Sequence, residues 1–190
     1  RVIRDDVLLP TPVAGVPPVF DGQQASMFDI ALHPEFADNS LIYFSFAHGD
    51  DKANGTRLVR ARYVPGEDGA ALEDLEVLFT AAPLKESGLH YGGRIVFLPD
   101  GTLLMSVGEG YRYKDQAQKL DNDFGKIVRL NDDGSVPDDN PFVDRDGARP
   151  EIWSYGHRNP QGLYFDAVSG TVFETEHGPK GGDEVNIIEP

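Results

Sequence analysis

The sequence predicts an all-β fold, a β-propeller built from four-stranded blades, and three observations support this prediction. Strand-like hairpins recur with first strands near positions 29, 94 and 162, a period of roughly 65 residues. The 21 glycines and 14 prolines provide frequent turn signals, which are typical of many short strands. No segment shows the spacing of apolar residues that predicts an amphipathic helix. We therefore expect the chain to cover roughly half of a propeller ring.

The expected blades follow one another along a single partial domain. Residues 1–20 are expected to end a first blade, 21–85 to form a second, 86–155 to form a third, and 156–190 to begin a fourth. Alternating, β-branched or aromatic runs between polar turns mark the strands. These runs cover residues 27–33, 41–46, 57–63, 75–79, 93–98, 102–107, 126–130, 151–155, 163–165 and 171–175. An open arc leaves sheet edges uncovered, so self-association or a complementary segment is expected to close the ring.

The composition limits the partners of the chain. Seventeen basic and 32 acidic side chains give a formal net charge of −15, which argues against nucleic acid and anionic membranes. No stretch approaches the roughly 18 apolar residues of a membrane-spanning helix, so no membrane insertion is expected. The absence of cysteine excludes disulfides and thiolate metal sites. Because the chain begins with arginine and shows no signal peptide, we expect it to be processed or cut from a longer chain.

Polar clusters flank the last predicted hairpin, whose strands are joined by a turn at Ser169-Gly170. A hairpin of this length places the residues before its first strand and after its second strand at the same end of a sheet. Arg158 and Asn159 stand in the first cluster, and their position before Pro160 fixes their direction. Such a pair is suited to gripping adjacent carbonyl oxygens. The alternative is a structural arginine paired with one of the many carboxylates.

The second cluster contains a turn at Gly178-Pro179, followed by the acidic pair Asp183-Glu184. Calcium takes oxygen ligands, often backbone carbonyls of tight turns together with nearby carboxylates. The cluster therefore predicts a Ca²⁺ site. A solvated acidic turn is the alternative explanation of the same residues.

Two further polar residues stand just before predicted strands. His90 precedes Gly92-Gly93, so we expect its ring to project at the mouth of a sheet rather than into a core, where it can act as a base. Packing in a surface turn is the alternative. Gln23 lies in a turn with Gly22, and taken alone it is better explained as an ordinary polar loop residue.

In combination, these motifs resemble the soluble quinoprotein glucose/sorbosone dehydrogenase family, specifically its aldose sugar dehydrogenase branch. The resemblance covers nearly the whole chain in the same order. It rests on the runs 156–162, 176–179 and 181–184, on Gly22-Gln23 ahead of 31–34, and on His90 ahead of Gly93-Arg94. It implies a six-bladed propeller that carries pyrroloquinoline quinone (PQQ) over the centre of its top face. It also implies a periplasmic or secreted oxidoreductase that acts on aldose sugars and passes electrons to an external acceptor.

The resemblance implies roles for the residues that would bind the quinone and the sugar. His90 matches the general base that removes the proton of the anomeric hydroxyl, while the hydride of the same carbon passes to the C5 carbonyl carbon of PQQ. Arg158 and Asn159 match residues that hold the quinone oxygens, and Arg158 would also stabilise the negative charge that develops there. Gln23 matches another contact to the cofactor.

The resemblance implies two roles for Ca²⁺ as well. The carbonyls of Gly178 and Pro179 match ligands of the catalytic Ca²⁺, which acts as a Lewis acid on the quinone. Glu184 resembles a carboxylate that serves a second, structural Ca²⁺.

The chain also departs from the family pattern. The basic residues that bind the carboxylates of PQQ in the family lie outside the matched half. The loop after the strand at 102–107 reads Glu109-Gly110-Tyr111-Arg112-Tyr113, so we expect one side chain that contacts the cofactor to be absent there. We therefore expect the isolated chain to bind quinone weakly unless another segment completes the ring.

Two other functions fit parts of the pattern. A calcium-dependent propeller lactonase would need several carboxylates and an asparagine in the central channel, and it would show no absorbance change with quinone. A non-catalytic propeller fragment that self-assembles would form multimers, and the substitution His90→Ala would change nothing functional.

Overall fold

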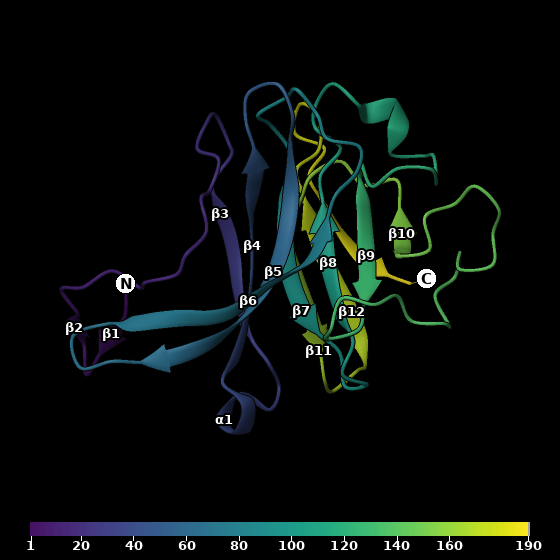
Figure 1. Ribbon diagram of the computed structural model, residues 1–190. Helices are drawn as coiled ribbons and strands as arrows, with labels where there is room; N and C mark the ends of the chain where they lie inside the picture. Colours follow the sequence, from purple (N-terminus) through teal and green to yellow (C-terminus); the bar gives the residue numbers. More distant parts are fainter. Residues whose placement is uncertain (190) are drawn as a thin grey trace.

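The computed structural model describes residues 1–189, which form an all-β protein. Three antiparallel sheets stand side by side in chain order, and a short hairpin of β1 (Ile3–Arg4) and β2 (Val7–Leu8) precedes them (Figure 1). The helical elements in this range are α1 (Phe36–Asn39) and the 3₁₀ turn η1 (Lys114–Gln116). Neither is long and apolar enough to cross a membrane.

Within each sheet, every strand pairs with the next strand in the sequence. The first sheet has the order β3-β4-β5-β6 and the second has the order β7-β8-β9-β10, while the third contains β11, β12 and β13. The bounds of the strands are β3 Met27–Leu32, β4 Leu41–Gly49, β5 Asn54–Pro65, β6 Ala70–Thr80, β7 Gly92–Phe97, β8 Leu103–Val107, β9 Lys126–Leu130, β10 Ile152–Tyr155, β11 Pro160–Asp166, β12 Thr171–Glu176 and β13 Glu184–Ile188.

The second sheet supplies the core because it packs on both of its faces. Side chains alternate along a strand, so Leu103 and Met105 of β8 point to one face and Leu104 points to the other. Leu103 and Met105 pack with Tyr43 and Leu58 of the first sheet. Leu104 packs with apolar residues of the third sheet. Full burial of each such side chain contributes roughly 1.5–3 kcal/mol, so the sheets are held together chiefly by these apolar contacts.

The propeller prediction is confirmed. The first strand of the second sheet, β7, contacts the first strands of both neighbouring sheets, β3 and β11, as the radial arrangement of blades in a propeller requires. The predicted hairpins at 27–46, 93–107 and 163–175 are all present.

One strand extends well beyond its prediction. The strand β6 begins at Ala70 rather than 75, because β5 and β6 continue past the sheet as a two-stranded arm (Figure 1). Ion pairs between charged residues connect the two strands of this arm. The guanidinium of Arg62 lies 2.7 Å from the carboxylate of Glu73 and 3.0 Å from that of Asp74. These polar residues interrupt the apolar alternation that marks the rest of the strand.

Candidate functional site

The topology gathers the predicted polar residues at one end of the sheets. In an antiparallel sheet, the segment before the first strand and the segment after the second strand lie at the same end. Gln23 precedes β3, His90 precedes β7, and the pair at 158–159 precedes β11. Backbone hydrogen bonds link these loops, because the N–H of Gln24 donates to the carbonyl of Gly88 at 2.9 Å. The N–H of Glu109 donates to the carbonyl of Arg158 at 2.8 Å.

A buried histidine–carboxylate pair forms the centre of this end. Nδ1 of His90 lies 2.7 Å from Oε1 of Glu109, and the side chains are only 7% and 4% exposed. The other carboxylate oxygen of Glu109, Oε2, is buried without a hydrogen-bond partner. The ring of Tyr111 packs edge-on against the imidazole at 5.3 Å between centroids. Nδ1–H of His90 therefore donates to Glu109, and Nε2 is left as the basic nitrogen.

The exposure of His90 differs from the sequence-based expectation. Its ring does not project openly at the mouth of the sheet, since Glu109 and Tyr111 cover it. The residue adopts a positive φ of 52°, a conformation that non-glycine residues rarely adopt. Two hydrogen bonds hold it there: its N–H donates to Oε1 of Gln24 at 2.9 Å, and its carbonyl accepts from the N–H of Gly110 at 3.2 Å.

A buried lysine supports the same loop. The ammonium of Lys85 donates to the carbonyls of Ser87 and Leu89, and it stands 3.5 Å from the centre of the Tyr91 ring. Burial lowers the pKa of Lys85 to about 7, although the nearby charge of Glu109 opposes the shift. This cation therefore contributes to the electrostatic environment of the His90–Glu109 pair.

A glutamate, Glu176, fixes the backbone of the predicted Arg158–Asn159 pair. Oε2 of Glu176 accepts the backbone N–H groups of Arg158 at 2.5 Å and Asn159 at 3.2 Å. Burial alone would raise the pKa of Glu176, but the His157 ring and these two N–H groups outweigh it and lower the pKa. The guanidinium of Arg158 donates to the carbonyl of His177 at 2.6 Å, which directs it toward the Gly178 turn.

Asn159 is buried, and its side-chain oxygen is used within the protein. That oxygen accepts from Nε2 of Gln161 at 3.1 Å and from the N–H of Gly92 at 3.4 Å. The asparagine therefore ties β11 to the segment that carries His90, and its amide nitrogen is the donor that remains for a ligand.

The turn at Gly178-Pro179 is closed tightly. A Cβ atom at position 178 would overlap the carbonyl oxygen of Gly182, so only glycine fits there. The N–H of Gly178 donates to a carboxylate oxygen of Asp183 at 2.9 Å, and the carbonyl of Pro179 accepts from Gly182 at 3.3 Å. Glu184 lies outside this turn, at the start of β13, where its carboxylate accepts from Asn186 at 3.2 Å.

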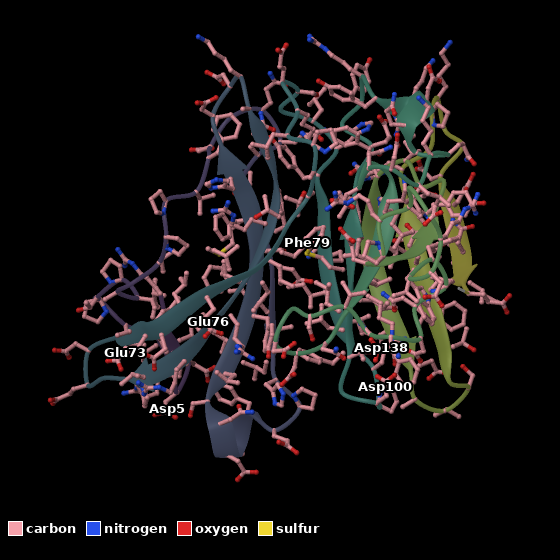
Figure 2. The ribbon with its side chains drawn as sticks, turned by 45° about the vertical axis from the view of Figure 1, so that its right-hand side comes forward. Asp5, Glu73, Glu76, Phe79, Asp100 and Asp138 are labelled. Atoms are coloured by element: carbon pink, nitrogen blue, oxygen red, sulfur yellow. The ribbon has the colours of Figure 1, made fainter. Side chains whose placement is uncertain are left out.

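A cleft of about 810 Å³ lies between these loops, and its lining is basic. Although the whole chain carries a net charge of −15, the cleft contains four cationic side chains and one carboxylate, Glu109. The cations are Arg112, Lys114, Arg158 and Lys180. Figure 2 shows the acidic residues Asp5, Glu73, Glu76, Asp100 and Asp138 in the lower half of the molecule, away from the loops at the upper end. The excess of cations in the lining of the cleft suits an anionic ligand.

Sequence reasoning did not assign Lys85, Glu109 or Glu176 to the site. Glu109 follows the second strand of its hairpin, β8, just as the Gly178 turn follows the second strand of the next hairpin, β12. This equivalent position was the sequence signal that could have assigned Glu109 to the site. Lys85 and Glu176 are recognised as site residues by their burial in the structure. The sequence does not reveal this burial, because a polar residue in a loop or an alternating strand is usually exposed.

The sequence of this chain is similar to a family model and to curated proteins. The family model described as Glucose / Sorbosone dehydrogenase matches residues 1–190. Aldose sugar dehydrogenase YliI of Escherichia coli is 43% identical over 94% of this chain and 48% of its own length. Quinoprotein glucose dehydrogenase B of Acinetobacter calcoaceticus is 32% identical over 88% of this chain and 38% of its own length. The chain thus spans about half, or less, of these curated relatives.

Solved structures show the same similarity. The apo form of the soluble aldose sugar dehydrogenase of Escherichia coli superposes with a TM-score of 0.88 and 42% identity, over 94% of this chain and 51% of that one. The PQQ-bound form of aldose sugar dehydrogenase of Streptomyces coelicolor superposes with a TM-score of 0.76 and 33% identity, over 94% of this chain and 49% of that one.

Proposed function

The chain belongs to the glucose/sorbosone dehydrogenase family, and from this premise we propose that it provides the catalytic histidine and part of the cofactor site of a PQQ-dependent aldose dehydrogenase. The reaction oxidises the anomeric carbon of an aldose to the lactone. The hydroxyl proton would go to a base of this chain, and the hydride of the same carbon would go to the bound quinone. An external acceptor then takes the two electrons.

The buried His90–Glu109 pair is the observation that carries this proposal. Glu109 and Tyr111 both line the cleft and both contact the His90 ring, so the imidazole lies directly behind the lining of the cleft. Glu109 accepts Nδ1–H and fixes the tautomer, so Nε2 receives the proton of the anomeric hydroxyl. The carboxylate also stabilises the imidazolium that forms. A positioned base of this kind contributes roughly 10²–10⁴-fold to the rate.

The residues of the cleft fit PQQ, which carries three carboxylates and an ortho-quinone. The four cations of the cleft complement the negative charge of this molecule. Arg158 and the amide nitrogen of Asn159 are the donors for the quinone oxygens, and Gln23 adds a contact from the loop beside Gly88. When bound, PQQ supplies a carbonyl carbon that accepts the hydride. Arg158 is also a catalytic residue in this proposal, because its charge stabilises the oxygen that becomes negative.

The turn at 178–179 fits a hard cation. Carbonyl oxygens of tight turns are ligands that Ca²⁺ prefers, and the carbonyl of Pro179 keeps a second lone pair beside the hydrogen bond that it accepts from Gly182. The carbonyls of Gly178 and Pro179 would hold a Ca²⁺, which would supply a Lewis acid for the quinone. We assign the carboxylate of Glu184 to a second, structural Ca²⁺.

The outer faces of the arc support a larger assembly. On β3, Ile30 and Leu32 are 59% and 55% exposed, and on β13, Val185 and Ile187 are 75% and 62% exposed. Apolar rows of this kind on a sheet need a covering partner. In this proposal the expected blades at 21–85, 86–155 and 156–190 are completed by further blades, or by another copy of the chain, and the assembled enzyme works in the periplasm or outside the cell.

A titration of PQQ and Ca²⁺ into the protein, with the molecular mass recorded in parallel, tests this function. We expect weak binding of quinone by the monomer. In a self-associated form, or with a segment that completes the ring, we expect a saturable change in the quinone absorbance that requires Ca²⁺, followed by reduction to the quinol when an aldose is added. A lactonase would hydrolyse a lactone without any quinone change. Multimers that do not bind quinone would favour a self-assembling propeller without catalytic function.

A further inference from the structure

A second cluster of possible metal ligands lies beside the cleft, which His157 lines, and it connects the Arg158 loop to strand β12. One ligand atom each from His157, Glu174 and Glu176 lies within 4.8 Å of the other two. All three residues are buried, with exposed fractions of 6%, 0% and 9%. The cluster shares none of its residues with the turn at Gly178-Pro179.

The hydrogen bonds of this cluster are incomplete. Oε1 of Glu174 is fully buried and has no hydrogen-bond partner, although the other oxygen accepts from Asn186 at 3.0 Å. Nδ1 of His157 lies 3.6 Å from Oε1 of Glu176, which is longer than a hydrogen bond. An unpartnered buried carboxylate oxygen is destabilising, so a ligand at this position would be stabilising.

The charges of the cluster are also unbalanced. Among residues 1–189, neither Glu174 nor Glu176 forms an ion pair with a lysine or arginine, and the histidine is the nearest group that can carry positive charge. The amide of Asn186 is a neutral donor shared among carboxylates. Two adjacent buried carboxylates require a cation or a proton between them.

We propose that His157, Glu174 and Glu176 bind one divalent cation of the zinc and manganese class, separate from the Ca²⁺ of the cleft. One imidazole and two carboxylates suit Zn²⁺ or Mn²⁺, whereas Ca²⁺ prefers oxygen ligands alone. The outer contacts of such a site are already present: Ser154 bonds the second ring nitrogen of His157 at 3.0 Å, and Asn186 bonds Glu174.

The cation would have a structural role. Glu176 also accepts the backbone N–H groups of Arg158 and Asn159, so a metal ion that fixes Glu176 would fix the position of these two residues. It would join strand β12 to the segment before β11 without contacting the sugar.

Calorimetric titration of the chelator-treated protein with Zn²⁺, and separately with Mn²⁺, tests the proposal. We expect one saturable site for at least one of these ions, and a loss of affinity of about 100-fold or more in Glu174→Gln, which keeps the size of the side chain but removes its charge. Asp132→Asn is the matched control, because Asp132 pairs with His33 at 3.5 Å elsewhere in the protein. It should bind the ion like the wild type.

A second measurement needs no variant. Co²⁺ added to the chelator-treated wild type should give absorption bands of a nitrogen- and oxygen-ligated ion, and Zn²⁺ should displace them. The proposal is overturned if the wild type binds neither Zn²⁺ nor Mn²⁺, if Glu174→Gln binds them equally well, or if excess Ca²⁺ displaces the ion readily. The first result would mean that Glu174 holds a proton instead.

Discussion

Nδ1 of His90 lies 2.7 Å from Oε1 of Glu109, in a pair that is almost completely shielded from solvent. The two residues come from different loops, one before β7 and one after β8, and the antiparallel pairing of these strands brings them together. The pair gives the imidazole a fixed tautomer and a fixed direction. It is therefore the part of the site whose alteration should have the largest effect on proton transfer.

Replacing Glu109 with glutamine should slow the reduction of bound quinone by aldose. Glutamine can still accept a hydrogen bond from Nδ1, but it cannot stabilise the imidazolium by charge. We expect a fall of about 10²–10⁴-fold in the reduction rate, with little change in quinone affinity. Glu86→Gln is the control, because Glu86 is exposed in the loop before His90. Equal effects of the two substitutions on the rate would contradict the assigned role.

Replacing Gly178 with alanine should weaken Ca²⁺ binding, because the added Cβ would overlap the carbonyl of Gly182 and force the turn open. Val168→Ala is the control, because Val168 is 96% exposed in the turn between β11 and β12. Calcium titrations in the presence of quinone would measure both affinities. If the two variants bind Ca²⁺ equally well, the closed turn is not the binding site.

Removing the exposed cations of the cleft should weaken the binding of PQQ. We expect Lys114→Ala and Lys180→Ala each to raise the dissociation constant several-fold at low salt, roughly 0.5–1 kcal/mol each, and the effect should shrink as salt screens the charges. Arg62→Ala, on the distant arm, is the control. A salt dependence that is unchanged in both lysine variants would argue against an electrostatic contribution from the cleft.

The stability of the protein should depend on pH through Lys85. Burial lowers its pKa from 10.5 to about 7 in the folded state. Between these two values the unfolded chain keeps a proton that the folded chain has released. The free energy of unfolding therefore rises with pH in this window, by up to ~1.4 kcal/mol per pH unit. Denaturant unfolding of the wild type and Lys85→Met at a series of pH values should show curves that diverge above about pH 7. Parallel curves would show that Lys85 does not titrate in this way.

The sequence pattern predicted the strands well because their apolar alternation is a local property. The hairpins around Ile30, Val96 and Phe165 all stand where the alternation placed them. The first strands of the three sheets, β3, β7 and β11, also lie next to one another, as a propeller requires. The arm of β5 and β6 was underestimated because its charged residues form ion pairs across the strands instead of burying an apolar face.

The site was only partly predictable. Arg158, Asn159 and the Gly178 turn stand in dense local motifs, and the closing hairpin brings them together as expected. Glu109 and Glu176 act through contacts with residues 19 and 18 positions away in the sequence. Such contacts depend on strand register and burial, which no local pattern encodes. The burial of the His90 ring could not be predicted for the same reason, because Tyr111 and Glu109 contact it from the next loop.

The central claim is that His90 removes the proton while a hydride leaves the same carbon. Rapid mixing of the PQQ- and Ca²⁺-loaded protein with an aldose, unlabelled or deuterated at the anomeric carbon, tests it most directly. We predict that deuterium slows quinone reduction in the wild type, and that His90→Gln binds quinone but reduces it at least about 100-fold more slowly. Reduction by His90→Gln at the wild-type rate would contradict the account.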